Sequence, residues 1–475
     1  MMKTVGIIGA GAAGLCGARH ALAAADLTPI IWEQSSRVGG TWVYTQELGK
    51  DKYGLPIHSS MYKNLKTNLP KEAMAFPDFP FPKGEESFIH HTEVRSYLES
   101  YCDHFNIKPC IKFRHHVEEV SPVMREEGPP AWNVTVKDLE NNVSSTATCD
   151  ALLICNGHYS VPRVPYVKNI DSFMGRKIHS HDYREPLPYK DNTVVILGAA
   201  ASGLDICLEI SGVAKKVYLS HNQPVNHPSE FPANVQQVRG VVEATENGFN
   251  LGDGSHIEAD VIMFCTGYEF SFPFLTKECG ITVEDNVVKP LYKHLIHSTY
   301  PSMAFIGIPF LVCPFPLFDF QAQHFIAILT GHLKLPSSEE MVTLTSEEMN
   351  QKNEDGIPSR HYHKIGMSGQ RKYTEEVVEE TGCTPPKSYV FPMLTTVFIR
   401  LILDATHFKE IRYRVLPDGG FEEFKNGRLV STKLDIFGLV LKRIFQMKFL
   451  DCYRLMKFIA VMIIRRLGGL IGLYK

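Results

Sequence analysis

The fold is decided by the stretch Lys3-Thr4-Val5-Gly6-Ile7-Ile8, which continues as Gly9-Ala10-Gly11-Ala12-Ala13-Gly14 and then as an alanine-rich run to Ala25. This order predicts a short buried strand that turns at Gly9 into a helix. Gly9 permits the tight turn, Gly11 lets the backbone approach a phosphate without a Cβ, and Gly14 lets the helix pack against its strand. Free backbone N–H groups at the positive end of the helix then indicate a site for a dinucleotide pyrophosphate.

A second predicted strand supplies the acid that such a site needs. The strand Pro29-Ile30-Ile31-Trp32 ends at Glu33, 19 residues after Gly14, and Gln34 follows. This is close to the spacing of about 20 residues expected for an acid that binds the ribose hydroxyls. The loop Arg37-Val38-Gly39-Gly40-Thr41-Trp42 comes next, where the ligand would continue past its phosphates. The alternative, a glycine turn before an ordinary surface helix, does not explain strand, helix and acid together.

The composition is that of a globular protein of 475 residues, 44% hydrophobic and 21% charged, with a formal net charge of −3. Without an overall basic field, we expect no nucleic-acid partner. The 11 cysteines contain no C-x-x-C pair and no metal-ligand spacing, so we expect no disulfide scaffold, no redox dithiol and no metal site. No signal-type apolar segment opens the chain, and we therefore expect the protein on the cytosolic side.

A second glycine turn follows later in the chain. The strand Thr193-Val194-Val195-Ile196-Leu197 leads into Gly198-Ala199-Ala200-Ala201-Ser202-Gly203 and a helix over residues 204–210. Ala200 stands where the middle glycine is usual, which weakens the signal. After the next strand, Ser220 and His221 occupy the place where an NAD site would have an acid. The absence of an acid favours NADP, although the arginine that would bind its 2′-phosphate is also missing there.

Two such turns in one chain predict an α/β protein with two dinucleotide-binding (Rossmann-like) domains, one for FAD and one for NADPH, the NADP domain being inserted in the FAD domain. The expected domains are residues 1–185 and 281–430 for FAD, residues 186–280 for NADP, and a helical C-terminal tail over residues 431–475. Further expected elements are a helix over 91–105, strands between 112 and 137 with a turn at 126–130, a strand over 151–155, and a helix that opens at Gln321 after a Phe- and Pro-rich loop.

The stretch Phe173-Met174-Gly175-Arg176-Lys177-Ile178-His179-Ser180-His181-Asp182-Tyr183 fits the pattern F-x-G-x-x-x-H-x-x-x-Y/F. With this stretch the chain resembles the flavin-containing monooxygenases, which are class B flavoprotein monooxygenases, over about residues 3–400. The residues from His179 to Pro186 and the weakened second glycine turn are more similar to invertebrate and plant members than to the vertebrate drug-metabolising ones. Further stretches that carry the resemblance are Gly39-Gly40-Thr41-Trp42, Thr67-Asn68-Leu69-Pro70-Lys71-Glu72, Phe76-Pro77-Asp78-Phe79-Pro80, Cys155-Asn156-Gly157-His158-Tyr159 and Cys265-Thr266-Gly267-Tyr268.

The resemblance implies an NADPH-dependent monooxygenase of the N,N-dimethylaniline type. In this chemistry NADPH reduces FAD, O2 adds to form a C4a-hydroperoxyflavin, and a soft nitrogen or sulfur atom of a small molecule takes the distal oxygen. Asn68 is then the catalytic side chain at the flavin edge, whereas His179 and Tyr183 organise the linker between the domains. The predicted cofactor-binding residues are Gly9, Gly11, Ala12, Ala13, Gly14, Glu33, Gln34, Gly40, Thr41, Trp42, Thr67, Asn68, Gly198, Ala201, Ser202, Gly203, Ser220, His221 and Gln321.

Other functions stay open at this point. Baeyer-Villiger oxygenation of ketones uses the same scaffold, although those enzymes carry a tryptophan where this chain has Tyr183. A flavoprotein disulfide reductase is disfavoured because there is no C-x-x-C pair. A dinucleotide-binding redox sensor without turnover is supported by the weakened second turn alone. Homo-oligomerisation is a further option that the sequence leaves open.

The C-terminal stretch, residues 445–475, is rich in apolar residues but has no uninterrupted run of the ~20 needed to span a bilayer. It carries six basic residues and one acid from Gln446 onward. We interpret it as a basic amphipathic helix that lies on an anionic membrane surface. The alternative is a helix that packs the same face against the protein's own core. Because animal relatives sit on the endoplasmic reticulum, we expect attachment to its cytosolic face, and a cytosolic protein otherwise.

Overall fold

The computed structural model describes residues 2–223, 226–430 and 436–440. Strand β1 is an inner strand of a seven-stranded sheet whose order is β20-β21-β22-β7-β1-β2-β3. The five strands from β22 to β3 run parallel, and β20 and β21 add an antiparallel edge. The strands are β1 (Lys3–Ile8), β2 (Leu27–Glu33), β3 (Ile111–Phe113), β7 (Ala151–Ile154), β20 (Leu291–Tyr292), β21 (Ile296–His297) and β22 (Met303–Phe305).

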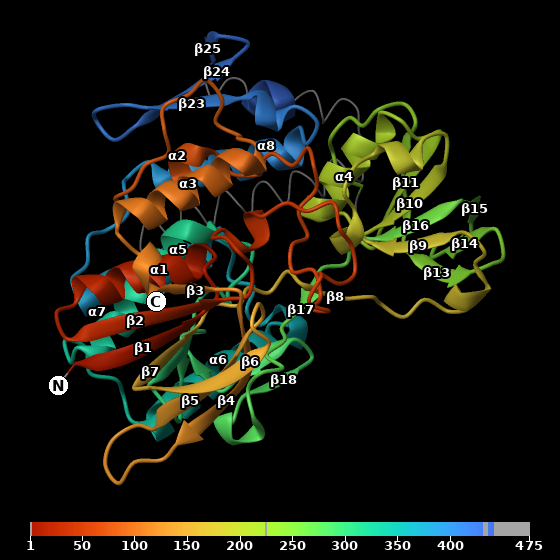
Figure 1. Ribbon diagram of the computed structural model, residues 1–475. Helices are drawn as coiled ribbons and strands as arrows, with labels where there is room; N and C mark the ends of the chain where they lie inside the picture. Colours follow the sequence, from red (N-terminus) through yellow and green to blue (C-terminus); the bar gives the residue numbers. More distant parts are fainter. Residues whose placement is uncertain (1, 224–225, 431–435, 441–475) are drawn as a thin grey trace.

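This first sheet is covered on both faces, as parallel sheets are. Helices α1, α3 and α5 lie on one face, and the antiparallel sheet β4-β5-β6 lies on the other (Figure 1). The helices are α1 (Ala12–Ala23), α3 (His91–His104) and α5 (Pro314–Leu329), and the strands are β4 (His115–Val123), β5 (Ala131–Asp138) and β6 (Val143–Cys149). The predicted helix over 91–105 and the strands between 112 and 137 are therefore confirmed.

One predicted helix start is wrong. The helix expected to open at Gln321 begins at Pro314, within the stretch that was expected to be a loop. Pro314 and Pro316 fit the first turn because the backbone N–H groups there have no partner inside the helix, so proline removes no hydrogen bond. The apolar side chains of that stretch are buried against the core, with Phe315 and Phe320 each 1% exposed.

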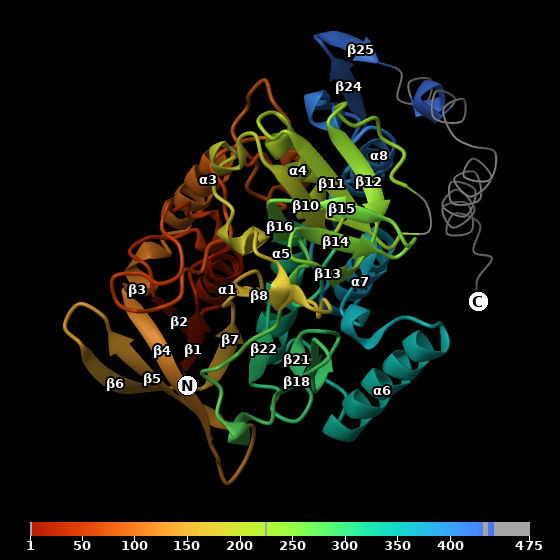
Figure 2. The ribbon, with the colours of Figure 1, turned by 90° about the vertical axis from the view of Figure 1, so that its right-hand side faces the viewer.

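The second unit is a five-stranded parallel sheet with the order β12-β11-β10-β16-β9; Figure 2 shows the first four of these strands, and Figure 1 shows β9 beside β16. Its elements are β9 (Arg176–His179), β10 (Thr193–Leu197), α4 (Ala201–Ser211), β11 (Lys216–His221), β12 (Val235–Arg239) and β16 (Val261–Phe264). The smaller sheet of β13 (Val241–Ala244), β14 (Gly248–Leu251) and β15 (His256–Glu258) packs on one face. Strand β9 comes from outside the expected segment 186–280, and the domain boundaries stay a prediction.

The chain enters and leaves the second unit through neighbouring segments. Strand β8 (Val161–Pro162) pairs with β17 (Tyr268–Glu269), and both lie between the two units in Figure 1. The second sheet thus lies between β7 and β22 in the chain, although those two strands are neighbours in the first sheet. The predicted fold class, α/β with two Rossmann-type units and one nested in the other, is confirmed.

Further helices and hairpins surround the first unit, with α6 at the edge of the molecule in Figure 2. These elements are α2 (Lys71–Met74), which comes earlier in the chain, and β18 (Thr282–Glu284), β19 (Val287–Lys289), α6 (Ser338–Glu354), α7 (Gly366–Thr381), α8 (Val390–Leu403), β23 (Arg412–Val415), β24 (Phe421–Lys425) and β25 (Arg428–Val430). Within the described ranges, no helix combines the length and the apolar character that crossing a bilayer requires. The predicted tail helix over 445–475 lies outside the described residues.

Candidate functional site

The glycines of the first turn differ in whether the protein's own packing requires them. Gly9 has φ +100°, and a Cβ there would lie 2.7 Å from the Cys155 carbonyl oxygen. A Cβ at Gly14 would lie 1.9 Å from the Gly9 carbonyl oxygen, so the helix packs on the strand as predicted. Gly11 is different, because its backbone is extended (φ −73°) and a Cβ would meet nothing closer than Gly40 Cα at 3.5 Å. Protein packing explains Gly9 and Gly14 but not Gly11, where the close approach of a phosphate stays the predicted reason for glycine.

Helix α1 begins directly at this turn, with Ala12 and Ala13 in its first positions and Gly11 as the N-cap residue. No side chain caps the helix, and its first turn carries no acid. The backbone N–H groups of the first turn have no partner within a helix and form a binding site for an anion. The residues at this turn therefore fit a dinucleotide pyrophosphate.

Glu33 lies at the carboxyl end of β2, beside the glycine turn, and is 7% exposed. Its Oε2 accepts a hydrogen bond from the Ala10 N–H at 2.8 Å, and its Oε1 accepts one from the Ser35 N–H at 2.8 Å. These two bonds hold the carboxylate next to the turn, and each oxygen can accept a further bond, such as one from a ribose hydroxyl. Burial lowers the pKa of the neighbouring His58, although the charge of Glu33 opposes that shift.

The loop after Glu33 folds onto the turn. Gly40, Thr41 and Trp42 form the short helix η1 (Gly40–Trp42) and are half-buried. Gly40 has φ +55°, and a Cβ there would lie 3.0 Å from Gly11 Cα, so the two backbones are in contact. The structure therefore brings this predicted segment to the first glycine turn.

Asn68 lies on an ordered loop, and the residue before it, Thr67, forms two hydrogen bonds with Ile89. The Thr67 N–H donates to the Ile89 carbonyl oxygen at 2.8 Å, and Thr67 Oγ1 accepts from the Ile89 N–H at 3.1 Å. The next helix, α2, has Pro70 as its N-cap residue and no side-chain cap, so Asn68 does not serve as its cap. The amide of Asn68 has no hydrogen-bond partner among the residues that the structure describes. Its two N–H donors and its oxygen are available to a ligand.

The second glycine turn repeats the geometry of the first. Gly198 has φ +115°, and a Cβ there would lie 2.4 Å from the Cys265 carbonyl oxygen. A Cβ at Gly203 would lie 1.9 Å from the Gly198 carbonyl oxygen, the same distance as between Gly14 and Gly9. Ala200 is extended (φ −90°) and exposed, so the alanine introduces no backbone strain. Ala201 and Ser202 open α4 without a side-chain cap, and this turn also fits a pyrophosphate.

Ser220 and His221 lie at the carboxyl end of β11, but the structure gives both of them partners. Ser220 Oγ donates to the Arg239 carbonyl oxygen at 3.0 Å and accepts from the Val241 N–H at 3.1 Å. His221 Nε2 lies 3.2 Å from Gln237 Oε1. Burial lowers the pKa of His221, although the hydrogen bond with Gln237 opposes that shift, so the free site favours the neutral ring.

The sequence reasoning missed Arg239 as a candidate cation. Strands β11 and β12 pair in parallel with His221 opposite Arg239, so the guanidinium lies at the edge where the phosphate group of NADP was expected. Its Nη1 donates to the Gln223 carbonyl oxygen at 2.8 Å. The signal in the sequence is an arginine at the end of the following strand, and no arginine stands directly after β11.

Gln321 is fully buried and bonded within the protein. Its Oε1 accepts from the Gly307 N–H at 2.9 Å, and its Nε2 lies 3.5 Å from the Tyr373 hydroxyl. Its predicted contact with a cofactor stays a prediction.

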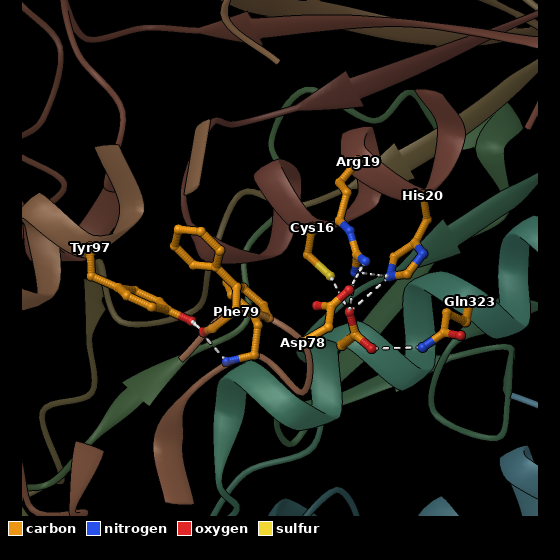
Figure 3. Close-up of polar contacts among 9 residues, drawn as sticks. Cys16, Arg19, His20, Asp78, Phe79, Tyr97 and Gln323 are labelled. Atoms are coloured by element: carbon orange, nitrogen blue, oxygen red, sulfur yellow. Dashed lines mark hydrogen bonds and ion pairs between the residues drawn. The ribbon is translucent and has the colours of Figure 1, made fainter. Parts of the chain in front are cut away.

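An ionic cluster around the buried Asp319 joins α1 to α5 behind the first turn. Asp319 accepts from His20 Nε2 at 2.8 Å, from Gln323 Nε2 at 2.6 Å and from Arg19 Nη1 at 3.3 Å (Figure 3). Arg19 also pairs with Asp78. Although burial opposes it, the hydrogen bond from His20 and the charges of His20 and Arg19 hold the pKa of Asp319 below its ordinary value. These contacts fix the helix that begins at the glycine turn.

The same cluster contains three groups that can bind metals, which the sequence did not predict to come together. One ligand atom from each of Cys16, His20 and Asp319 lies within 4.8 Å of the others. The guanidinium of Arg19 already supplies the positive charge beside Asp319. We therefore assign the cluster to helix packing.

The geometry of two glycine turns in one chain agrees with the comparison with known families. The model of the flavin-binding monooxygenase-like family matches residues 2–225 and 226–464. The chain belongs to this family. The flavin-containing monooxygenase FMO GS-OX5 of Arabidopsis thaliana is 36% identical over 424 residues, which are 86% of this chain and 91% of that protein. FMO GS-OX-like 4 of the same plant is 36% identical over 453 residues, 92% of this chain and 97% of that protein.

Solved structures support the same assignment. S-allyl-L-cysteine S-oxygenase from Allium sativum has a TM-score of 0.81 at 34% identity and covers 86% of this chain and 95% of its own. Tmm from Pelagibacter sp. strain HTCC7211 has a TM-score of 0.76 at 25% identity and covers 90% and 96%. Cyclohexanone monooxygenase, at 14% identity and a TM-score of 0.55, shares the fold alone. The predicted family is confirmed, and the family's cofactors are FAD and NADPH.

Proposed function

We propose that the protein uses NADPH and O2 to oxygenate a soft sulfur atom, and secondarily a nitrogen atom, of small molecules. The observation that carries this proposal is the pair of geometrically similar glycine turns in one chain, together with the amide of Asn68, which has no hydrogen-bond partner in the described part of the chain and lies on an ordered loop of the first unit. Sulfur comes first because the Allium sativum relative is described as an S-oxygenase. The specific thioether, and any amine substrate of the N,N-dimethylaniline type, belong to this proposal.

The residues have distinct roles in the proposal. Gly9, Gly11, Gly14 and Glu33 hold FAD, and the turn from Gly198 to Gly203 holds NADPH, with Arg239 binding its 2′-phosphate through a bidentate fork. When bound and reduced by NADPH, the flavin would activate O2, so that one oxygen atom goes to the substrate and the other leaves as water. The chain itself excludes water and aligns hydrogen bonds at the flavin edge.

Asn68 is the catalytic residue of the proposal. Its amide N–H would donate to the oxygen that gains negative charge during the reaction, and its oxygen would accept from an N–H group of the bound cofactor. Because no residue of the described chain uses this amide, forming these bonds breaks no existing bond. A preorganised donor of this kind costs little reorganisation when the reaction occurs.

The ketone alternative receives no support from a specific contact. Tyr183, at the position of the Baeyer-Villiger tryptophan, is fully buried, and its hydroxyl donates to Glu209 Oε2 at 2.8 Å.

We further propose that the tail over residues 445–475 attaches the protein to the cytosolic surface of the endoplasmic reticulum.

The experiment is oxygen transfer under ¹⁸O2. The purified protein receives NADPH together with S-allyl-L-cysteine, N,N-dimethylaniline or cyclohexanone, and mass spectrometry follows the label. We expect one ¹⁸O atom in the sulfoxide and a smaller yield of labelled N-oxide. A labelled lactone as the main product would instead assign Baeyer-Villiger chemistry. NADPH oxidation without label in any product would overturn the proposal.

A further inference from the structure

Helix α4, which begins at the second glycine turn, presents two acids to the first unit. Asp205 and Glu209 are four residues apart and therefore lie on one face of the helix. The Tyr62 hydroxyl donates to Asp205 Oδ2. Asn64 Nδ2 donates to Glu209 Oε1 at 2.7 Å. Both partners come from residues 62–68, here called the Asn68 loop, which faces α4 across the border of the two units (Figure 1).

A lysine from a third part of the chain closes this contact. Lys409 belongs to the short helix η8 (Phe408–Glu410). Its Nζ donates to Asp205 Oδ1 at 2.6 Å and to the Lys66 carbonyl oxygen at 3.1 Å. Lys66 is two residues before Asn68, so one ammonium group holds both α4 and the Asn68 loop. The side chains of Lys409 and Asp205 are 19% and 23% exposed, and this partial burial screens the ion pair less than bulk water would.

The charges around the contact favour its retention at neutral pH. Burial, followed by the charge of Asp205, raises the pKa of Tyr62 far above its ordinary value, so its hydroxyl remains a donor. Burial raises the pKa of Glu209, while the hydrogen bonds from Asn64 and Tyr183 and the charge of Lys409 oppose that shift. Lys409 thus pairs with Asp205 directly and acts on Glu209 through its charge.

We infer that Lys409 and Asp205 form a clamp that holds the Asn68 loop in register with the helix of the second glycine turn. The clamp makes Lys409 and Asp205 positioning residues, which place Asn68 relative to the unit that binds the nicotinamide cofactor. Without the clamp, each unit keeps its own ligand, but their relative position is less defined. Reducing equivalents would then be lost as hydrogen peroxide. This inference rests on the proposed function.

The loop keeps other anchors, so removal of the clamp is expected to leave the protein folded. The Lys63 N–H donates to the Arg184 carbonyl oxygen at 2.8 Å, and the His91 N–H donates to the Leu65 carbonyl oxygen at 3.0 Å. Lys63 Nζ also pairs with Glu185 at 3.3 Å, but its side chain is 60% exposed. Lys63→Met therefore removes a cation from the same loop without touching α4, and serves as the matched control.

The test compares Lys409→Met, Lys409→Arg and Lys63→Met in the full-length, FAD-loaded protein. Hydrogen exchange of the Asn68 loop, measured with and without NADP⁺, reports the clamp without any turnover. We expect NADP⁺ to slow this exchange in the wild type and in Lys63→Met, and to have little effect in Lys409→Met. For turnover, we expect the peroxide released per NADPH to rise about tenfold in Lys409→Met, because a misplacement of ~1 Å can cost about 100-fold in rate. Lys409→Arg should restore most of the wild-type behaviour in both measurements.

The outcomes separate the inference from the proposed function. If Lys409→Met matches the wild type both in hydrogen exchange of the Asn68 loop and in the peroxide released per NADPH, the clamp does not exist. If Lys63→Met changes as much as Lys409→Met, a general loss of positive charge explains the effect and the clamp is refuted. If the wild type gives no labelled product but the exchange difference is present, the proposed function fails and the clamp stands.

Discussion

Gly11 and Gly14 stand three residues apart on one turn, yet the structure predicts opposite consequences for the same substitution. A Cβ at Gly14 would lie 1.9 Å from the Gly9 carbonyl oxygen, and real Cβ contacts essentially never fall below 3.0 Å. In Gly14→Ala, helix and strand must therefore move apart by about 1.1 Å, against backbone that cannot rotate away. Overpacking of this kind costs about 1–3 kcal/mol and more where backbone is involved. We expect at least about 3 kcal/mol lower stability of the FAD-free protein.

Gly11→Ala places its methyl group 3.5 Å from Gly40 Cα, which is ordinary contact. Removing conformational freedom from the unfolded chain stabilises by about 0.4–1 kcal/mol. Losing glycine at the N-cap costs a similar small amount. The FAD-free stability of this variant should therefore match the wild type. The methyl group instead occupies the space where the pyrophosphate approaches, and a clash of about 1–3 kcal/mol weakens FAD binding roughly 10- to 100-fold.

The assay measures both quantities on each variant. Denaturant unfolding of the FAD-free protein gives the free energy of unfolding, and titration with FAD, followed by flavin fluorescence, gives the dissociation constant. Wild-type FAD affinity in Gly11→Ala would show that the first turn does not bind the pyrophosphate. Wild-type stability in Gly14→Ala would show that the strand and helix do not pack as closely as the structure has them.

Four further outcomes are expected. The flavin of Asn68→Asp should be reduced by NADPH at the wild-type rate in stopped-flow, but the variant should form little sulfoxide, because a carboxylate cannot donate a hydrogen bond. Unchanged sulfoxide formation in the product assay would remove Asn68 from the site. Arg239→Ala should raise the KM for NADPH about tenfold and leave that for NADH unchanged; equal changes for both carriers would argue against a phosphate contact. The hydrogen bond from His324 lowers the pKa of Glu380 from 4.5 to about 2. The contribution of the Glu380 carboxylate to the free energy of unfolding is therefore complete above pH 4.5 and is lost as the pH falls toward 2. Glu380→Gln should flatten this part of the profile of stability against pH, and an unchanged profile would contradict the role given to Glu380. Truncation before Phe445 should keep FAD and activity but abolish binding to anionic vesicles; loss of FAD would place the tail in the core.

Much of the site was predictable because its determinants are local. A strand, a turn at positive φ and a helix follow one another within residues 3–25, and the apolar run, glycine spacing and acid are all read directly from the chain. The same holds for the second turn. Ala200 weakened that signal in the sequence but not in the structure, because the position is extended and accepts any residue. Asn68 came from the family resemblance, and the structure adds that its amide has no partner among the described residues.

Other features depended on packing that the sequence does not encode locally. The prolines at 314 and 316 indicated a loop, and the burial of their apolar neighbours against α1 made that segment the start of α5. Arg239 became a candidate only through the pairing of β11 with β12.

The sequence by itself thus determined the two glycine turns and the acid, since each depends on backbone geometry within a few residues. Tertiary structure alone decided which side chains meet across the two units, as Lys409 and Asp205 do although they are 204 residues apart. Such contacts depend on how the sheets and helices pack as whole bodies, and no local pattern in the sequence records that.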